Sequence, residues 1–565
     1  MLKKIDNLIV KGKKHLKEFQ INILNECLEK KSGGLSLTMG SGKTLISIIL
    51  ALEIVKNNFK PILVVVSKTL IESWVHEIKK FFNDELNYQI FHSEYVKKID
   101  NYTINPDIIL FITTPEVLSK YYKKERIDNY FIYNTIVNEG RFNQHFIKNY
   151  NYPTVPYSNI NIGGSILYST EWGCILVDEV QNHTKISTIK CQSIASLCSN
   201  SRWALSGTLL NEPSFERILG YYLIINDITF PRNLPDAEKL LKSKDFKGTN
   251  LSLVIRKDNP LFIKPKINQK IITHNLSNEE QMLYLSMKKI LNIINTQVRK
   301  FKVLGDTINT RKFSTYKLAI ITYLRQCLVC SLVPIANIAI DMIDFKNRSI
   351  LSEMLSNEIN NLNLQKWLED LDSVKSTRFK EVLNVIDNHM YDNIVLFTCF
   401  RTTIDILKEF LPKDRKIFNI TSSMSASKRS KIVEEFNNGN NGNKGNILLL
   451  TYEIGGEGLN LQKIANTVIL LDFVWSDGKT SQAIARVLRY GQESEEVNIY
   501  HFISNTAMEK SIFEKHKIKL KIIEELETGG IKTNTKKITV NDIIKIIEKD
   551  ENLNILNEIH QIKMK

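Results

Sequence analysis

The feature that most constrains this chain is a repeated alternation of short apolar runs with amphipathic helical stretches. In the first part, runs rich in β-branched residues are followed by helical patterns at residues 44–56 and 71–82. This alternation is typical of an α/β fold with a largely parallel sheet. The strands predicted for this part are residues 35–38, 62–66, 108–113, 174–177 and 203–206.

The same alternation returns later in the chain. Strands are predicted at residues 394–398, 446–451 and 467–471, and helices at residues 402–410, 427–436 and 481–488. Between the two parts, long helical patterns replace the strands. We therefore predict two α/β lobes with mainly parallel sheets, residues 1–260 and 376–528, joined by a helical insert over residues 261–375. A length of 565 residues agrees with at least two cores.

Three segments look peripheral to these lobes. Residues 119–171, crowded with Tyr, Phe, Asn and Lys, are predicted to be an insertion in the first lobe. Its aromatic and lysine side chains could stack on bases, but a small folded hairpin or a partner-docking surface is the favoured interpretation. Residues 437–446, rich in Asn and Gly, suit an exposed loop. Residues 529–565 are predicted to be a basic tail that ends in an amphipathic helix.

A predicted strand at residues 35–38 leads directly into Gly40, Ser41, Gly42, Lys43 and Thr44, and then into a helix. This is the context that a phosphate-binding loop requires, because glycines allow backbone N–H groups to surround phosphate oxygens at a helix N-terminus. Lys43 would add positive charge, and Thr44 would ligate Mg²⁺. A glycine turn that merely precedes a lysine is the plainer alternative.

A second acidic element should lie at the end of another buried strand. Asp178 and Glu179 follow the apolar run 174–177, where Asp178 would hold Mg²⁺ and Glu179 would act as the general base toward water. Alone, an Asp-Glu pair is common at surface turns. Together with the phosphate loop, it predicts a site for nucleoside triphosphate hydrolysis.

Two arginines, Arg486 and Arg489, lie three residues apart in the segment 482–492. On a helix they would share one face and could reach a common target. A γ-phosphate bound by the other lobe is such a target, and hydrolysis would then depend on lobe closure. A solvated basic face is the alternative.

Net charge and cysteine content indicate which kinds of binding partner and site to expect. The net charge of +15 favours a polyanionic partner, although charge that serves solubility is equally compatible. The seven cysteines do not resemble a disulfide framework. Cys327 and Cys330 form a CxxC without a second ligand pair, so two buried helix residues are favoured over a metal site. No targeting or membrane segment is evident, and a soluble intracellular protein is expected.

Taken in order, these and further segments resemble the Swi/Snf-type branch of superfamily 2, a family of DNA-translocating ATPases. The resemblance covers roughly residues 16–510. Its last segment, 482–492, is the most specific. The segments that carry it are residues 16–20, 38–44, 61–66 with Trp74 and Glu77, 113–116, 178–181, 206–211, 324–327, 395–397 with Phe400, 455–461 and 482–492.

This resemblance implies two RecA-like P-loop lobes that use ATP and Mg²⁺. It implies that Gln20 recognises adenine, that Gly458 and Gln482 also bind the nucleotide, and that Arg486 and Arg489 are arginine fingers. The chain departs from the family pattern in having Leu37 in place of the first loop glycine, Gln181 for a His, Leu209 for a Pro and Leu488 for a His. None of these departures removes a phosphate ligand, a metal ligand or an arginine finger.

The resemblance implies an ATPase that moves on double-stranded DNA without separating its strands. A strand-separating DNA or RNA helicase is the first alternative, and a nucleic-acid-binding scaffold with an inactive ATPase, suggested by Leu37 and Gln181, is the second. A metabolic P-loop kinase would not need the second lobe. The compact motor and the richness in Asn, Ile and Lys resemble small motors of large DNA viruses, so RNA polymerase or other transcription proteins are possible partners.

Overall fold

The structure of the chain is a computed structural model. It describes residues 2–37, 40–96, 104–105, 107–122, 165–199, 201–207, 209–210, 214–227, 230–242, 254–257, 260, 265–343, 349–374, 376–421, 423–439, 444–455, 459–474, 477–514 and 517. These residues form two compact units, the first mainly Met1–Ile263 and the second mainly Lys264–Trp475 with Lys479–Lys517. Most of the predicted insertion, Gly458 and the predicted basic tail lie outside the described residues.

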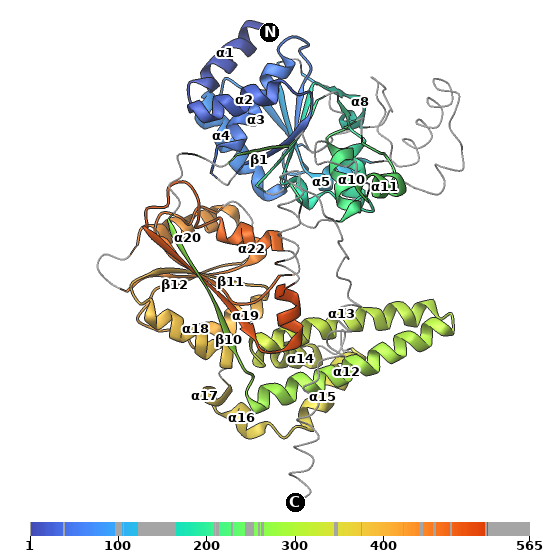
Figure 1. Cartoon of the computed structure of the whole chain (residues 1–565), viewed down its shortest axis with the longest axis vertical. Helices are drawn as coiled ribbons and strands as arrows, with labels where there is room; N and C mark the ends of the chain where they lie inside the picture. The colour runs from blue at the N-terminus through green and yellow to red at the C-terminus, as the bar shows by residue number, and fades with distance from the viewer. Residues whose placement is uncertain are drawn as a thin grey trace, which may run out of the picture. The chain divides into compact units, whose positions relative to one another are not determined.

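The first unit is built on a 7-stranded sheet whose paired strands all run parallel (Figure 1). Parallel pairing places the carboxyl ends of all these strands at one edge. In spatial order the strands are β3 (Tyr88–Phe91), β4 (Leu110–Thr113), β2 (Ile62–Val65), β6 (Cys174–Asp178), β8 (Arg202–Ser206), β1 (Gly33–Leu37) and β9 (Val254–Lys257). Two further strands, β5 (Glu171–Trp172) and β7 (Cys198–Ser199), form a small parallel pair.

Helices cover both faces of this sheet, as expected for an α/β unit (Figure 1). Alternate residues of β6 show the division, since Cys174 and Leu176 pack in one cluster and Ile175 and Val177 in the other. One face is covered by α1 (Leu2–Lys13), α2 (Glu18–Leu28), α3 (Lys43–Val55) and α4 (Ile71–Phe82). The other is covered by α5 (Pro115–Tyr121), α8 (Ile166–Ser169), α9 (Ile189–Ala195), α10 (Phe215–Ile224) and α11 (Leu234–Lys242).

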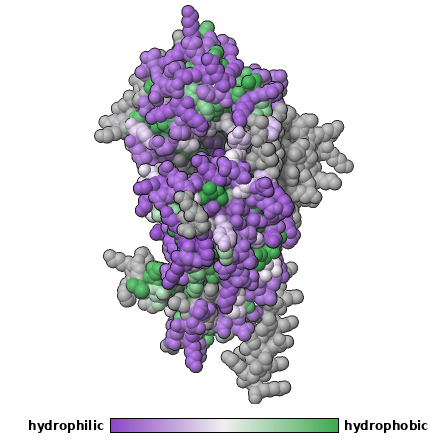
Figure 2. Space-filling view, turned by 90° about the vertical axis from the view of Figure 1, so that its left-hand side faces the viewer, coloured by the Kyte–Doolittle hydropathy of each residue, from purple (hydrophilic) through white to green (hydrophobic). Residues whose placement is uncertain are grey.

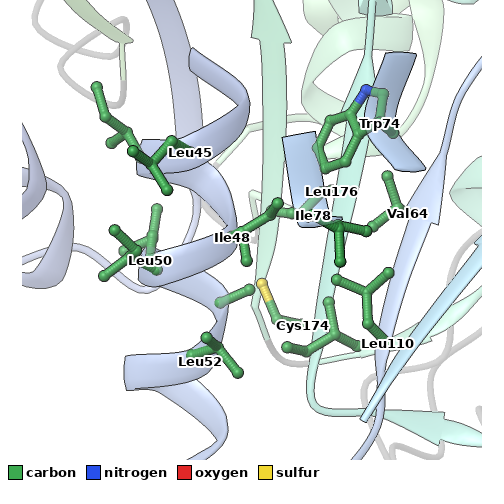
Figure 3. Packing of buried hydrophobic residues seen from close by; sticks show 14 of the residues in the cluster. Leu45, Ile48, Leu50, Leu52, Val64, Trp74, Ile78, Leu110, Cys174 and Leu176 are labelled. Atoms are coloured by element: carbon green, nitrogen blue, oxygen red, sulfur yellow. The ribbon is translucent and has the colours of Figure 1, made fainter. Parts of the chain in front are cut away.

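Figure 3 shows the first of these clusters from close by, where Ile48 of α3 points toward Ile78 of α4 and Leu176 of β6. Fully burying one such side chain stabilises the fold by roughly 1.5–3 kcal/mol. On the face of the molecule in Figure 2, hydrophilic side chains cover most of the described surface, and hydrophobic ones form small separate groups. Among the described residues, no helix is both long enough and apolar enough to span a membrane.

The second unit contains a 6-stranded sheet, and its strands also pair in parallel. Helix α18 (Thr377–Asn388) and α19 (Arg401–Lys408) pack on one face, and α20 (Ala426–Asn437) packs on the other. In spatial order the strands are β10 (Lys266–His274), β15 (Glu496–Ser504), β14 (Ala465–Leu470), β11 (Asn393–Thr398), β13 (Ile447–Thr451) and β12 (Ile417–Ile420). Two short helices, α21 (Tyr452–Gly455) and α22 (Asp477–Ile484), complete this unit.

A helical region follows β10 and belongs to the second unit. Its main feature is an antiparallel hairpin of two long helices, α12 (Asn278–Val303) and α13 (Thr307–Val329) (Figure 1). A reciprocal capping box fixes the start of α12, because Ser277 Oγ accepts from Glu280 N at 3.2 Å and Glu280 Oε2 accepts from Ser277 N at 2.8 Å. The region continues with α14 (Leu332–Ile343), α15 (Ile350–Asn360), α16 (Gln365–Glu369) and α17 (Leu371–Val374).

The predicted fold class, α/β with two lobes on mainly parallel sheets, is confirmed. The prediction of helix alone after residue 260 was wrong for β10, a strand of 9 residues. This strand lies at the sheet edge, where Ile267 and Ile271 each remain 46% exposed, so it lacks the buried alternation that marks a strand. Strands β3, β5, β7, β9, β12 and β15 were also not predicted. Cys327 and Cys330 are buried as expected, and burial raises the pKa of each thiol to about 12.

A buried ionic network holds the second sheet together around Arg378 of α18, whose side chain has 0% exposure. Its Nη2 lies 2.5 Å from Glu509 Oε2, its Nη1 donates to Leu471 O at 2.9 Å, and its Nε donates to His274 Nε2 at 3.4 Å. Burial and the guanidinium lower the pKa of His274 to about 3, so this ring is neutral and can accept. Arg378 thereby connects β10 to the ends of β14 and β15.

We expect Arg378→Met to destabilise the second unit by about 3–5 kcal/mol, because the carboxylate of Glu509 would stay buried without its partner. Hydrogen exchange followed by mass spectrometry should show lost protection in β10, β14 and β15. Lys266→Ala is the matched control, since its pair with Glu496 is exposed, and it should leave the exchange unchanged. Equal protection in Arg378→Met and wild type would show that the network does not stabilise the sheet.

Candidate active site

The loop predicted to bind phosphate lies between β1 and α3, which is the strand-to-helix context expected from the sequence. Gly40 and Gly42 have positive φ values of 83° and 79°, which side chains with a Cβ rarely adopt. Helix α3 begins at Lys43, and its first turn contains no acidic residue, so its N-terminus suits an anion. Lys43 Nζ donates to Leu37 O at 2.8 Å, which holds the ammonium over the loop.

Gln20 contacts this loop directly. Its side chain is 8% exposed, and its Nε2 donates to Ser41 O at 2.8 Å. Its Oε1 accepts from Lys17 N at 2.8 Å, within a capping box at the start of α2. A Cβ on Gly42 would lie 2.4 Å from Gln20 Nε2. The amide therefore supports the loop backbone, a contact that the motif alone did not reveal, and its predicted role at adenine stays a prediction.

Asp178 ends β6 on the sheet face that α3 and α4 cover, because it continues the alternation of Cys174 and Leu176. Both of its oxygens accept hydrogen bonds. Trp74 Nε1 donates to Oδ2 at 2.8 Å, and Glu179 N donates to Oδ1 at 2.9 Å. Burial and then the neighbouring Glu179 carboxylate raise the pKa of Asp178 to about 6, although Trp74 and the Lys43 ammonium lower it.

Glu179 follows in a left-handed backbone conformation, with φ 47°. This conformation is uncommon outside glycine and often marks a functional site. The Gln181 side-chain amide donates to the Glu179 carboxylate. Gln181 is fully buried, and its backbone oxygen accepts from Arg217 Nη1 of α10 at 3.4 Å. The residue that replaces the family's usual His therefore orients the predicted general base.

The donor set of this site fits a hard divalent cation. Asp178 offers a carboxylate and Thr44 a hydroxyl, and Mg²⁺ prefers such oxygen ligands. Burial and the Glu179 carboxylate raise the pKa of Asp178 more than the Lys43 ammonium lowers it. The positive charge of the protein therefore does not fully stabilise the ionised form of this carboxylate. Among the described residues, no group of three or more His, Cys, Asp or Glu side chains could hold a metal ion. In nucleoside triphosphate sites, Mg²⁺ is typically held by one or two protein ligands together with phosphate and water oxygens.

In the second unit, the prediction that Arg486 and Arg489 share a helix face was wrong. Helix α22 ends at Ile484, and tighter turns follow, with Arg486 N donating to Ala483 O at 3.1 Å. Arg489 Nη1 instead donates to Asn460 Oδ1 at 2.6 Å, and Leu461 N donates to Arg486 O at 3.2 Å. Both arginines are thus fixed against the segment that precedes β14.

Two other predicted nucleotide-binding residues lie near these arginines in the sequence. Gln482 lies on α22 and is partly buried, and Gly458 falls outside the described residues. Gln492 was not singled out. Its Nε2 donates to Ala465 O at 2.9 Å and Val487 O at 3.1 Å, which fastens the turns to β14.

Comparison with protein families gives two matches, one in each half of the chain. The SNF2-related domain matches residues 17–216, and the helicase conserved C-terminal domain matches residues 376–491. Residues 17–216 thus match the SNF2-related family and residues 376–491 the helicase C-terminal family, and the predicted resemblance to helicase-like ATPases is confirmed. The chain is accordingly an ATP hydrolase of the helicase type, as the motifs predicted.

Sequence identity between this chain and individual relatives is low. The chain is 26% identical to the putative helicase 172L of invertebrate iridescent virus 6 over 86% of its own length and 83% of that protein. It is 26% identical to the RAD54-like DNA repair and recombination protein of Drosophila erecta, over 64% of its own length and 46% of that protein. A solved SWI2/SNF2 ATPase core of Sulfolobus solfataricus in complex with dsDNA covers 91% of this chain and 93% of its own, with 19% identity and a TM-score of 0.36.

Because Gln20 lies so close to Gly42, substitutions at these two positions should have interdependent effects on the free energy of unfolding. Gly42→Ala should destabilise the first unit by about 2–4 kcal/mol, from backbone strain and from the overlap of the new Cβ with Gln20. In a Gln20→Ala background the same change should cost less, because only the strain remains. Thermal unfolding of the two single variants and the double variant measures this difference.

Gly305 provides the control, because its φ is +69° but nothing lies within 4 Å of the position that a Cβ would take. Gly305→Ala should therefore show strain alone, about 1–2 kcal/mol, whether or not Gln20 is present. A Gly42→Ala cost that is independent of Gln20 would rule out the steric coupling.

The raised pKa of Asp178 predicts a pH dependence of stability. Its folded pKa of about 6 exceeds the ordinary value of 3.8, so between these pH values the folded protein keeps a proton that the unfolded chain has released. This group therefore lowers stability progressively as the pH rises from about 4 to 6. Asp178→Asn removes the effect, so its stability relative to wild type should rise over that range and then level off. Urea unfolding in magnesium-free buffer from pH 4 to 8 tests this, and a constant difference would contradict it.

Proposed function

We propose that this chain couples ATP hydrolysis to movement along duplex DNA. The observation that carries the proposal is the meeting of two elements at one edge of the first sheet. These are the phosphate loop Gly40–Thr44 and the pair Asp178 and Glu179. The match of the second half to a helicase C-terminal domain supports a motor rather than a metabolic kinase.

The proposed roles follow from the chemistry of each side chain. The backbone of Gly40–Thr44 would bind the phosphates, Lys43 would offset their charge, and Thr44 with Asp178 would hold Mg²⁺. Bound there, Mg²⁺ would neutralise charge that develops on the phosphate oxygens. Gln20, Gly458 and Gln482 would complete the binding of the nucleotide.

The proposed reaction is attack of water on the γ-phosphorus of ATP. The bond from this phosphorus to the bridging oxygen of ADP breaks as the new phosphorus–oxygen bond forms, and the proton of the water passes to Glu179. Gln181 would hold the carboxylate of Glu179 in place through its amide. Arg486 and Arg489 would stabilise negative charge on the transferred group, which would make hydrolysis depend on both units.

One observation agrees with a nucleic-acid partner, and a second favours DNA as that nucleic acid. The net charge is +15, as expected for a protein that contacts backbone phosphates without reading bases. The RAD54-like relatives are named as DNA repair and recombination proteins. A motor in transcription or nucleoprotein remodelling, with RNA polymerase or other transcription proteins as partners, fits the resemblance to viral motors and is proposed on that basis.

Steady-state ATP hydrolysis by the purified chain should be stimulated at least tenfold by duplex DNA and less by single-stranded DNA or RNA. Lys43→Ala and Arg489→Ala should each lower the stimulated rate at least 100-fold, because both remove charge that stabilises the transferred phosphoryl group. On a duplex that carries a third strand, the wild type should displace that strand only when ATP is present.

Matched controls are Lys56→Ala, which lies just beyond the opposite end of α3, and Lys413→Ala, which is exposed in the second unit. Both should keep the wild-type rate. Stimulation only by single strands or RNA, with separation of a forked duplex, would favour the unwinding helicase. Absence of hydrolysis under all conditions would leave a nucleic-acid-binding scaffold.

A further inference from the structure

Trp74 joins the hydrophobic core to the proposed magnesium carboxylate. It lies on α4, is 2% exposed, and packs in the cluster between that helix and the sheet. Figure 3 shows its benzene ring toward Ile78 and Leu176 and its indole nitrogen on the far side from them. That nitrogen donates to Asp178 Oδ2 at 2.8 Å. The packing of α4 therefore sets where the donor lies.

This contact differs from the hydrogen bond of a comparable tryptophan in the same unit. Trp172 is 1% exposed, and its Nε1 donates to the backbone oxygen of Leu167 at 3.0 Å. A buried indole N–H needs an acceptor, and a nearby carbonyl is sufficient. At Trp74 the acceptor is instead the carboxylate proposed to hold the cation. Packing of the Trp74 ring in the core does not by itself require a carboxylate as the acceptor.

The geometry of the carboxylate explains what the indole contributes. An ionised carboxylate has about four lone-pair positions on its two oxygens. Trp74 and the backbone N–H of Glu179 occupy one on each oxygen, which fixes the plane of the group. Both donors are neutral, so they orient the carboxylate without cancelling the charge that a cation needs.

We propose that Trp74 is a positioning residue of the hydrolytic site, whose indole N–H aligns Asp178 for Mg²⁺ or its bound water. This inference rests on the proposed function. It assigns to α4 a direct part in magnesium binding, in addition to its packing role. It also predicts that losing the N–H weakens the effect of Mg²⁺ on nucleotide binding and leaves metal-free binding unchanged.

The test compares Trp74→Phe with Trp172→Phe in the full chain. Each change keeps an aromatic ring in the core and removes one indole N–H. Binding of a fluorescent ADP analogue is titrated once with about 5 mM Mg²⁺ and once with chelator. The readout is the Kd with chelator divided by the Kd with Mg²⁺. Trp74→Phe should lower this ratio about tenfold, as expected for loss of a hydrogen bond to a charged group, while Trp172→Phe keeps the wild-type ratio. Trp74→Leu is a second variant without a hydrogen-bond donor and should show the same lowered ratio as Trp74→Phe.

Three results would overturn the inference. The first is a wild-type ratio in Trp74→Phe and Trp74→Leu. The second is an equal loss of affinity with and without Mg²⁺, accompanied by a lower unfolding temperature than Trp172→Phe, which would reveal a packing role alone. The third is a wild-type chain that binds no nucleotide or binds it equally with and without Mg²⁺. Only the third result would also contradict the proposed function. Failure of the inference about Trp74 can therefore be told apart from failure of the proposed function.

Discussion

Parallel pairing of β1, β8 and β6 is the constraint on which the first unit depends. Because these strands run in the same direction, the segments that follow β1 and β6 emerge at one edge of the sheet. Residues far apart in the sequence, Lys43 and Asp178, are thereby close enough for the ammonium to lower the pKa of the carboxyl. The helices follow from the same constraint, since each crossover between parallel strands must cover a face of the sheet. The apolar sides of α3 and α4 therefore lie directly beneath the loop and the carboxylate that they support.

Asp178 is partly buried at the end of β6, and removing part of its carboxylate from water has a free-energy cost. Desolvation is the largest influence on its pKa, and the adjacent Glu179 adds to it. A salt bridge to a basic side chain would reduce this desolvation cost, but the basic side chain would also compete with a bound cation. The hydrogen bonds to Asp178 instead come from an indole and a backbone amide, which are neutral. The site is thus less stable by itself than it would be with a cation, as expected where a protein retains strain for function.

The sequence predicted the parts of this site that depend on local pattern. A strand, two glycines, a lysine and a helix define the loop, and an apolar run before Asp178 defines the second element, so both were found. Contacts between distant segments carried no such pattern. Nothing in the spacing indicates that Gln20 supports Ser41, that Trp74 reaches Asp178, or that Gln492 fastens the turns after α22. The helix predicted over residues 481–488 ends at Ile484 for a related reason, because tertiary contacts of Arg486 and Arg489 with Leu461 and Asn460 outweigh the local helical preference. The edge strand β10 was missed because exposure on both faces removes the alternating signal.

The two departures nearest the proposed chemistry also have a structural explanation. Leu37 replaces the first glycine of the usual loop, but its side chain is buried in β1, and only its carbonyl faces the loop, where it accepts from Lys43. The backbone supplies this contact whatever the side chain, so a glycine is not required for it. Gln181 replaces a histidine, yet its amide still donates to Glu179, and its own carbonyl is held by Arg217. A glutamine amide cannot titrate near neutral pH, whereas a histidine can. The hydrogen bond from Gln181 to Glu179 therefore does not depend on protonation of the residue at position 181.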